Sequence, residues 1–463
     1  MTLATNGSGR EDATKTNTSR TASDAGTSGE SSSNLGRYDV PFRLSAGASV
    51  SYRWSEKGSV GLKYTMSRKE SSETDFIDWF QGVSDRSNVS KFSSLEQNVS
   101  ADVMYRHSLA LSVKGIAGYM YRDYVSASEY WTGAVSGMDY VQGVAYLSAS
   151  ISGAFRKAGL RYSLSANVEN VRNRGVDISA GNNLDYDDFN VVPRLSLSWR
   201  AWKSGTLSAD YTVRTSRPRQ EMLNPAADVS DPENRSVGNP DLKGEVRHTA
   251  ELGLDQDFRT SWLRNISLDA YYSAVPDAIE RFSTADASGV RTTTYANIGK
   301  REEFGASLSV RFSITKAASL SLSAQAGRRS YMMQDGSENA YWTFSEMAIA
   351  RINLKYLTIL QTFMLMPSIS DAQTRAYCMY PDWNIEIGRY FKKIRLGVNL
   401  YCSDVLHGRN SVFSETSGPG FYDVRQSGRL GRSFGISAFW RIGRFKNAPS
   451  VRHSSYDLEC ITT

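Results

Sequence analysis

Apolar and polar residues alternate with a period of two through much of this chain. From Phe42 to Trp54 every second residue is apolar, and the residues between them are small, polar or basic. After the turn Ser55 to Gly58 a second alternating run covers residues 60–67, so the two runs predict a β-hairpin. The pattern returns over residues 160–169, 194–200, 207–214, 320–327 and 433–442. It predicts an all-β chain with one apolar and one polar face on each strand.

The predicted strands are long. They run to roughly 9–14 residues, whereas strands in globular sheets typically have about 5–6. A tilted strand needs roughly 9–11 residues to cross a bilayer. The lengths therefore favour a membrane barrel over a soluble sandwich.

Short and long connections alternate along the chain. Short turns are expected near residues 55–58, 106–109, 156–159, 202–205, 259–263, 314–317, 353–356 and 389–393. Long polar loops are expected near residues 68–97, 122–139, 170–188, 215–246, 275–293, 329–340, 366–374 and 403–430. Outer-membrane barrels have tight periplasmic turns and longer extracellular loops. Trp54, Trp199 and Trp202 lie beside short turns, where an aromatic girdle would place them.

The expected strand count is about sixteen to seventeen, because eight short turns join sixteen strands and a last strand covers Arg432 to Phe445. Bacterial single-chain barrels normally have an even count. Either one strand is miscounted, or the chain is the C-terminal part of a larger barrel. The first residues lack the basic and apolar regions of a signal peptide, which favours the second interpretation.

Three segments are expected on composition. Residues 1–37 are rich in Ser, Thr and Gly and predict a disordered segment. Residues 38–446 would form the partial barrel, and residues 447–463 a C-terminal tail.

Composition adds few candidates for chemistry. Among 463 residues, 25 Tyr, 18 Phe and 9 Trp suit a barrel wall, and a net charge of +6 is too small to indicate nucleic acid. The 3 Cys and 4 His form no metal-binding motif, and no nucleophile elbow or Walker loop is present. We expect no enzyme activity, cofactor or metal site. Strand parity places Cys378 inward and Cys402 outward, which predicts free thiols.

One region carries a more specific signal. The chain reads Arg217-Pro218, then Leu223-Asn224-Pro225, then Gly238-Asn239-Pro240-Asp241-Leu242 with Glu245, followed by Tyr295-Ala-Asn297-Ile-Gly299. In order and spacing these pieces resemble TonB-dependent outer-membrane receptors, in particular the receptor-like outer-membrane β-barrel family common in Bacteroidetes. The resemblance covers about residues 40–446, including a closing strand from Phe434 to Phe445. It implies that GNPDLKGE is the return of an extracellular loop into a barrel strand.

The resemblance also sets the expected fold and function. It implies a transmembrane antiparallel up-and-down β-barrel, with the present strands as the last part of a 22-strand barrel if the odd count holds. It implies plug-gated uptake of a scarce nutrient, such as a metal chelate, vitamin or glycan, across the bacterial outer membrane. The expected partners are outer-membrane lipid, a plug domain and the TonB complex, with no nucleic acid. None of the first 40 residues resembles the plug.

Two alternatives stay open. The first is a passive porin or a surface-binding barrel. The second is a soluble β-propeller or lectin-like binding module, since the short turns recur at intervals similar to propeller repeats. A propeller, however, would need four short strands in each repeat.

Candidate contact residues are of two kinds, and no substrate-binding residue is assigned. Charged residues expected on the luminal face are Arg53, Lys63, Arg161, Arg200, Asp210, Arg214, Asp269 and Arg395. Aromatic residues expected on long loops are Trp79, Phe80, Phe413 and Tyr422, since binding residues concentrate on loops.

Overall fold

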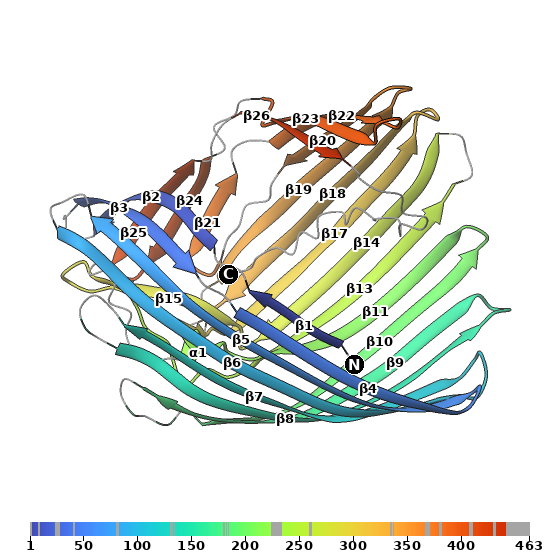
Figure 1. The fold of residues 1–463 in the computed structure, drawn as a ribbon, viewed down its shortest axis with the longest axis horizontal. Helices are drawn as coiled ribbons and strands as arrows, with labels where there is room; N and C mark the ends of the chain where they lie inside the picture. Colours follow the sequence, from blue (N-terminus) through green and yellow to red (C-terminus); the bar gives the residue numbers. More distant parts are fainter. Residues whose placement is uncertain are drawn as a thin grey trace.

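A single antiparallel meander forms most of the chain in the computed structural model (Figure 1). The structure describes residues 2–7, 10–23, 28–39, 42–79, 83–129, 133, 135–178, 181, 183, 185–223, 234–258, 262–333, 336, 338–365, 371–378, 382–406, 411–428 and 432–440. In this part of the chain, 23 strands belong to one sheet and three to a second sheet.

Seventeen consecutive strands of the large sheet, here called the wall, pair in chain order, each antiparallel to the next. They are β4 (Phe42–Ser55), β5 (Gly58–Trp79), β6 (Val83–Arg106), β7 (Ser112–Glu129), β8 (Val135–Phe155), β9 (Leu160–Asp177), β10 (Tyr186–Trp202), β11 (Gly205–Ser216), β13 (Glu245–Asp257), β14 (Leu263–Pro276), β17 (Lys300–Ser313), β18 (Ala318–Met332), β19 (Glu338–Asn353), β20 (Thr358–Leu365), β22 (Asp382–Phe391), β23 (Leu396–Ser403) and β26 (Ser433–Trp440). The expected all-β architecture and strand count are confirmed.

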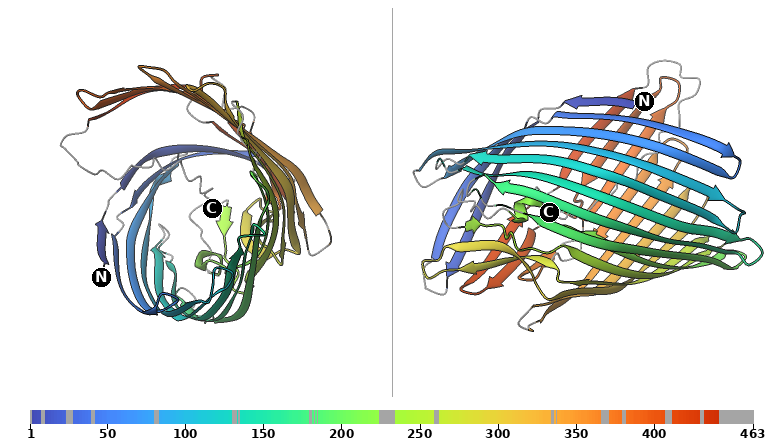
Figure 2. Two further views of the ribbon diagram at one scale, coloured as in Figure 1. Left: turned by 90° about the vertical axis from the view of Figure 1, so that its right-hand side faces the viewer. Right: turned by 90° about the horizontal axis from the view of Figure 1, so that it is seen from below.

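The wall curls around a central space, as the left view of Figure 2 shows. Its last strands, orange to red, arch over the blue first strands instead of joining them. Within the described residues, no pairing connects β4 with β26. The wall is therefore a rolled sheet whose first and last strands do not pair with each other.

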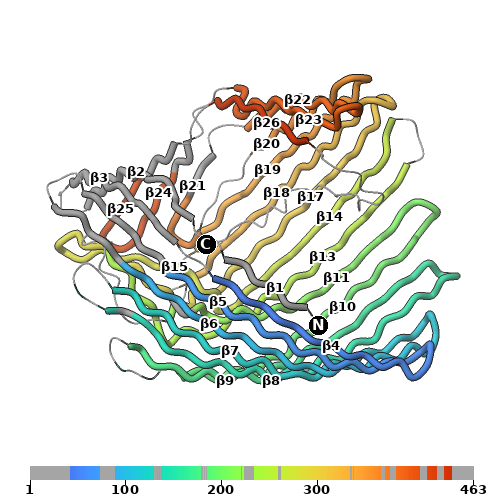
Figure 3. Tube along the Cα trace, viewed as in Figure 1, coloured from blue at the N-terminus to red at the C-terminus, as the bar shows by residue number. Residues whose placement is uncertain are grey.

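Seven of the eight predicted short turns occur at one end of the wall, the last of them at residues 392–395, whereas residues 259–261 of the eighth lie outside the described residues (Figure 3). The tightest are the two-residue turn between β4 and β5 and the turn between β10 and β11. Each closes a hairpin whose aromatic side chain lies over a glycine, Trp54 over Gly58 and Trp202 over Gly205. The expected aromatic positions beside the short turns are confirmed.

The long-loop end differs from the sequence prediction. Much of the predicted loop 68–97 is strand, since β5 continues to Trp79 and β6 begins at Val83, and the two pair throughout. β6 reaches 24 residues, well beyond the predicted length. From residue 68 to residue 75, β5 is polar on both faces, so hydrophobic periodicity could not reveal this extension, while backbone pairing needs no apolar side chains.

The apolar face of the wall is its exposed face. Leu62, Leu147 and Leu164 remain 57%, 59% and 50% exposed, and Phe434 on the last strand is 75% exposed. A soluble sheet would bury such a face, whereas a lipid-facing sheet leaves it open to hydrocarbon. Among the described residues, no helix is both long and apolar enough to span a membrane.

Smaller elements lie at the long-loop end. The short helix α1 (Gln220–Leu223) and strand β12 (Asn234–Ser236) lie within the curl in Figure 2. β12 pairs in parallel with β16 (Arg291–Asn297), which pairs with β15 (Ile279–Ala285); these three strands are called the inner sheet. β21 (Thr374–Cys378), β24 (Ser411–Gly418) and β25 (Phe421–Gly428) form a ladder that belongs to the large sheet, because β25 pairs with the N-terminal strand β2 (Arg10–Ser23).

Two buried apolar clusters pack the inner elements against the wall. One contains Met138, Tyr140, Leu223 and Leu242. The other contains Val275, Ala278, Ile298, Tyr331, Tyr341 and Ala372. The first draws on the connection after β11 and the second on the connection after β14, so both clusters lie at the long-loop end.

The N-terminal segment departs from the expectation of disorder. It contains β1 (Thr2–Gly7), β2 (Arg10–Ser23) and β3 (Ser28–Asp39), which pair with β4, β25 and β5 respectively. Strand edges offer backbone hydrogen bonds to any extended segment, so pairing does not depend on apolar content. The predicted domain boundaries stay predictions, and the predicted tail 447–463 lies outside the described residues.

Candidate binding site

The GNPDLKGE segment forms a compact turn at the start of β13. The Asn239 side chain accepts a hydrogen bond from the Asp241 N–H at 2.9 Å and donates one to the Tyr295 carbonyl at 3.0 Å. The Asn239 N–H donates to the carbonyl of Met222, at the helix α1. Pro240 and the Asx turn fix the local geometry. The turn therefore ties α1 to the inner sheet, and β13 begins at Glu245 as the sequence predicted.

Asn297 holds the other side of this turn. Its amide oxygen accepts from the Lys243 N–H at 2.9 Å, and its amide nitrogen donates to the Lys243 carbonyl at 3.1 Å. The same nitrogen lies 2.8 Å from the Asp277 carbonyl. One side chain at the end of β16 thus satisfies backbone groups from two other segments.

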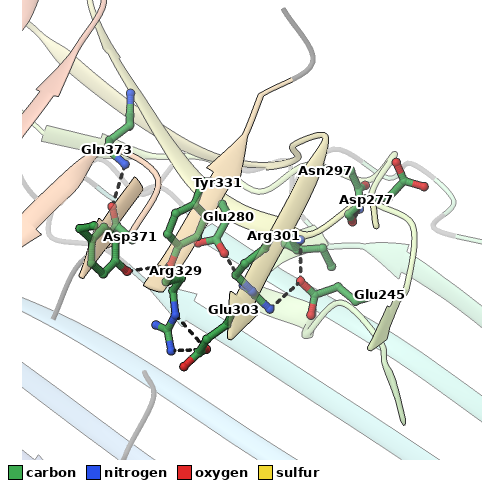
Figure 4. Close-up of polar contacts among 12 residues, drawn as sticks. Glu245, Asp277, Glu280, Asn297, Arg301, Glu303, Arg329, Tyr331, Asp371 and Gln373 are labelled. Atoms are coloured by element: carbon green, nitrogen blue, oxygen red, sulfur yellow. Dashed lines mark hydrogen bonds and ion pairs between the residues drawn. The ribbon is translucent and has the colours of Figure 1, made fainter. Parts of the chain in front are cut away.

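A charged cluster, here called the latch, joins the inner sheet to the wall (Figure 4). Arg301 on β17 lies between two carboxylates: it contacts Glu280 on β15 and is 3.6 Å from Glu245. The Glu245 carboxylate also accepts from the Ile279 N–H at 2.6 Å. Arg301 and both carboxylates are at least four-fifths buried. Burial raises the pKa of the Glu280 carboxyl above its ordinary value, although Arg301 opposes that change.

Gln373 fastens the far edge of the inner sheet. Its side-chain amide pairs in both directions with the backbone of Ser283, at 2.6 and 3.0 Å. The Gln373 carbonyl accepts from the Ser417 N–H, in the β24 strand. Gly418 lies so close to Ser283 that an added Cβ would come within 2.7 Å of its carbonyl oxygen. Only glycine permits this approach.

Arg291 makes a second contact with the same region. Its guanidinium is 3.3 Å from Asp423 and lies 4.5 Å above the centre of the Phe421 ring. Both partners lie on β25, so the inner sheet is bound to β13, β17 and the β24–β25 hairpin.

A cavity of about 820 Å³ opens between these segments. The polar side chains lining it come mainly from the turn (Asn239, Asp241, Lys243), from Asp277 and Asn297, and from Glu338, Asn339 and Gln373. Its apolar lining includes Phe282, Ile298, Met333 and Pro419. Ligand pockets in proteins span about 300–1,000 Å³, so the cavity has the size of a small-molecule site.

The cavity offers hydrogen bonds and charge rather than reaction chemistry. Asp241 and Asp277 direct no side-chain hydrogen bond or ion pair to any described residue, whereas Glu338 pairs with Arg328 at 3.0 Å. In the described part of the chain, no three His, Cys, Asp or Glu side chains are placed to hold a metal ion. The arrangement can bind a polar ligand through hydrogen bonds and charge.

The predicted luminal residues lie apart from this cavity. Most are on wall strands, on the side opposite the exposed apolar residues, and they are spread from β4 to β14. Asp210 lies opposite Glu251, and Arg214 opposite Arg247. The prediction for Arg395 is wrong: it lies in the turn between β22 and β23 with a φ of 55°. The alternating pattern was extended into the tight turn before β23, which begins at Leu396.

The predicted loop aromatics are only partly described. The side chains of Trp79, Phe80 and Phe413 lie outside the described residues, and Tyr422 is 49% exposed on β25. Its neighbour Phe421 makes the contact with Arg291 instead. Cys402 is a free thiol, as predicted, whereas the Cys378 side chain is outside the described part.

Several site residues were missed by the sequence analysis. Arg301, Glu280, Gln373 and Arg291 show no local motif, and their partners lie far away in the chain. Asn297 belonged to the quoted stretch Tyr295 to Gly299, but nothing in the sequence indicated that it binds Lys243. The only available signal was that the stretch Tyr295 to Gly299 follows the GNPDLKGE motif in the chain.

Comparison with known proteins agrees with this architecture. Residues 136–440 match the outer membrane protein beta-barrel family, and the chain belongs to that family. It is accordingly an outer-membrane protein. No sequence among curated proteins matches it.

Solved structures show the same fold at low identity. The copper transporter OprC is 11% identical with a TM-score of 0.60, over 92% of this chain and 80% of that one. The ferric-catecholate import receptor Fiu from K12 E. coli, in its closed form, is 10% identical with a TM-score of 0.55, over 88% of this chain. The chain covers 64% of Fiu. The hemophore receptor HasR of Serratia marcescens, solved with its hemophore HasA and heme, is 9% identical with a TM-score of 0.55, over 94% of this chain and 76% of HasR.

Proposed function

We propose that this chain forms the barrel wall of a TonB-dependent outer-membrane receptor that imports a scarce nutrient. Its substrate would be a metal chelate, a vitamin or a glycan, and the protein would move it without catalysing a reaction. A plug domain and the TonB complex would be its partners. Similarity to import receptors and a copper transporter supports this proposal at the level of fold.

One observation carries the proposal. The lipid-facing wall is combined with a polar cavity at the long-loop end. This cavity is built from the inner sheet and from the GNPDLKGE turn, which carries the family resemblance. Long loops face outside in barrels of this kind. The cavity would therefore meet nutrients before they enter the curl of the wall. A passive pore would not require such a built site.

Energised uptake tests this function in the cells that make the protein. An epitope is inserted at the exposed inner-sheet turn Asp286–Gly289, and a matched insertion is made in the short turn 314–317. Protease added to intact cells should remove only the first epitope.

Uptake should fall to the level of a deletion strain when a protonophore is added. Uptake that ignores the protonophore would instead support the passive barrel.

A further inference from the structure

The short-turn end of the wall carries an excess of positive charge. Its seven fully described turns contain nine Lys or Arg residues against one acidic residue, Glu56. We call these nine residues the basic rim, and all their side chains are exposed: Lys57, Arg156, Lys157, Lys203, Lys316, Lys355, Lys392, Lys393 and Arg395. The cavity at the opposite end differs, because three carboxylates line it against one lysine.

Backbone hydrogen bonds place neighbouring turns side by side along most of the basic rim (Figure 1). The Arg106 N–H donates to the Lys57 carbonyl at 2.7 Å, and the Arg200 N–H donates to the Gly159 carbonyl at 2.8 Å. Bonds of the same kind run from Ala154 to Leu109, from Asp257 to Ser204, from Ser313 to Trp262 and from Asn353 to Ala317. An extended negative surface would therefore meet many of these cations at once.

An aromatic girdle lies directly beside the basic rim. Its side chains are 45–66% exposed and belong to Trp54, Trp199, Trp202, Trp262, Tyr356 and Trp440. The Lys355 ammonium group lies 5.1 Å from the centre of the Tyr356 ring, so this cation and this ring share one level of the wall. Tryptophan and tyrosine concentrate at the level of lipid headgroups. The basic rim therefore lies where the headgroups of a bilayer begin.

We propose that the basic rim binds anionic phospholipid headgroups, such as that of phosphatidylglycerol, in the leaflet that the short turns face. Short turns of outer-membrane barrels face the periplasm, so this is the periplasmic leaflet. Lysine and arginine near a membrane surface are attracted to anionic lipid, and several of them act together.

The distribution of the cations favours lipid over an acidic protein. A docked protein needs charge in one sector, whereas these cations occur in six of the seven turns and follow the girdle along the wall. The inference goes beyond the proposed import function and does not depend on it, because a passive barrel with the same turns would bind the same lipid.

Two neighbouring turns provide the test variant. Lys157 and Lys203 lie in turns that the Trp199 indole joins, since its N–H donates to the Ala158 carbonyl at 3.1 Å. The variant Lys157→Gln/Lys203→Gln removes two charges there, and Lys157→Arg/Lys203→Arg keeps them.

A control variant removes the same amount of charge elsewhere. Lys69→Gln/Lys91→Gln neutralises two exposed lysines on β5 and β6, in the half of the wall nearer the long loops. Comparable heat-modifiable gel migration of the unchanged protein and all three variants would show that the fold is retained.

Lipid preference is measured on the full chain in mixed micelles by quenching of tryptophan fluorescence. The quenchers are phosphatidylglycerol and phosphatidylcholine with the same brominated chains, added in separate titrations. Of the 9 tryptophans, those at positions 54, 199, 202, 262 and 440 lie beside short turns, so the signal reports mainly on that end.

Phosphatidylglycerol should reach half-maximal quenching at a mole fraction at least about 3-fold lower than phosphatidylcholine, since each cation strengthens the attraction roughly fivefold. Lys157→Gln/Lys203→Gln should reduce this preference about 2-fold or more. The Arg variant and the Lys69/Lys91 control should keep it. Inorganic phosphate at the concentration of the lipid should also leave it in place, because phosphate has no acyl chains to hold it beside the girdle.

Other results would overturn the inference. Equal quenching by the two lipids would mean that the basic rim does not select anionic headgroups, and an acidic protein would then be the partner that its charge fits. A preference that survives Lys157→Gln/Lys203→Gln, or that the control reduces equally, would mean that other charges select the lipid. Loss of the preference in the Arg variant would mean that charge is not the cause. Loss on addition of inorganic phosphate would indicate a site for free anions.

Discussion

The wall and the inner sheet are both built of β-strands, but the wall exposes apolar side chains whereas the inner sheet buries polar ones. On the wall, Leu147 is 59% exposed, and its environment is lipid. In the inner sheet, Ser283 and Thr293 are only 3% and 7% exposed, and their hydroxyl groups pair with each other at 2.9 Å. The wall is stabilised by chain-order pairing, whereas the inner sheet depends on side chains that come from distant segments.

This difference shows where the specific information of the protein lies. Any alternating sequence with suitable turns can extend the wall, since its pairing is local and repetitive. The inner sheet needs particular partners: Arg301 between two carboxylates, Asn297 on the turn, and Gln373 on Ser283. Substitutions should therefore act on the two regions in different ways.

Removing the cation of the latch should have the largest effect. Arg301→Ala leaves Glu245 and Glu280 buried without their shared partner, and breaking a buried ion pair in this way costs about 3–5 kcal/mol. Urea denaturation in detergent micelles should show this loss. The triple variant Arg301→Met/Glu245→Gln/Glu280→Gln is the control and should be clearly more stable than Arg301→Ala. Equal stability of the two would mean that uncompensated charge is not the cause.

A charge on the lipid face should have the next largest effect. Leu147→Arg places a guanidinium among Ala117 and Val168, on the exposed face of β8, where such a residue costs about 2–4 kcal/mol near the bilayer midplane. Ser148→Arg, on the opposite face of the same strand, should cost far less. Folding into lipid vesicles, followed by the gel-shift assay, measures both. Equal costs would contradict the assignment of the two faces.

Loss of the Asn297 side chain should loosen the inner sheet without affecting the wall. Asn297→Ala removes hydrogen bonds to Lys243 and Asp277, each contributing about 0.5–1.5 kcal/mol. Hydrogen exchange should become faster at residues 279–297, while residues 160–169 of β9 stay protected. Asn297→Asp keeps the acceptor for Lys243 and should show a smaller change. Faster exchange in both regions would mean that they unfold together.

The smallest effect is expected at the short-turn end. The Trp199 indole N–H donates to the Ala158 carbonyl at 3.1 Å, linking two neighbouring short turns. Trp199→Phe keeps an aromatic ring and removes this bond, so the loss should be about 1 kcal/mol. Urea denaturation measures the change, and Trp440→Phe offers a matched control, since Trp440 donates similarly to Ile394 at 2.8 Å. An unchanged midpoint for Trp199→Phe would show that only the ring matters.

Much of the wall could be predicted from the sequence, and little of the site. The turns after Ser55 and Trp202 were placed correctly because Gly58 and Gly205 interrupt a clear alternation. The strand extensions beyond residue 68 were missed, since residues such as Ser71 and Glu73 are polar whichever face they occupy. The return into a strand at Glu245 followed from the family resemblance of GNPDLKGE, and β13 does begin at Glu245.

The sequence by itself determined the class of fold, because strand period and turn residues act over a few neighbouring positions. It also determined which face meets lipid, through the apolar residue at every second position. Only the tertiary structure decided the candidate site. Ser283 and Gln373 are 90 residues apart in the chain, and Arg291 and Asp423 are 132 apart. Such pairs produce no periodic pattern in the sequence, since only the tertiary structure brings the two residues together.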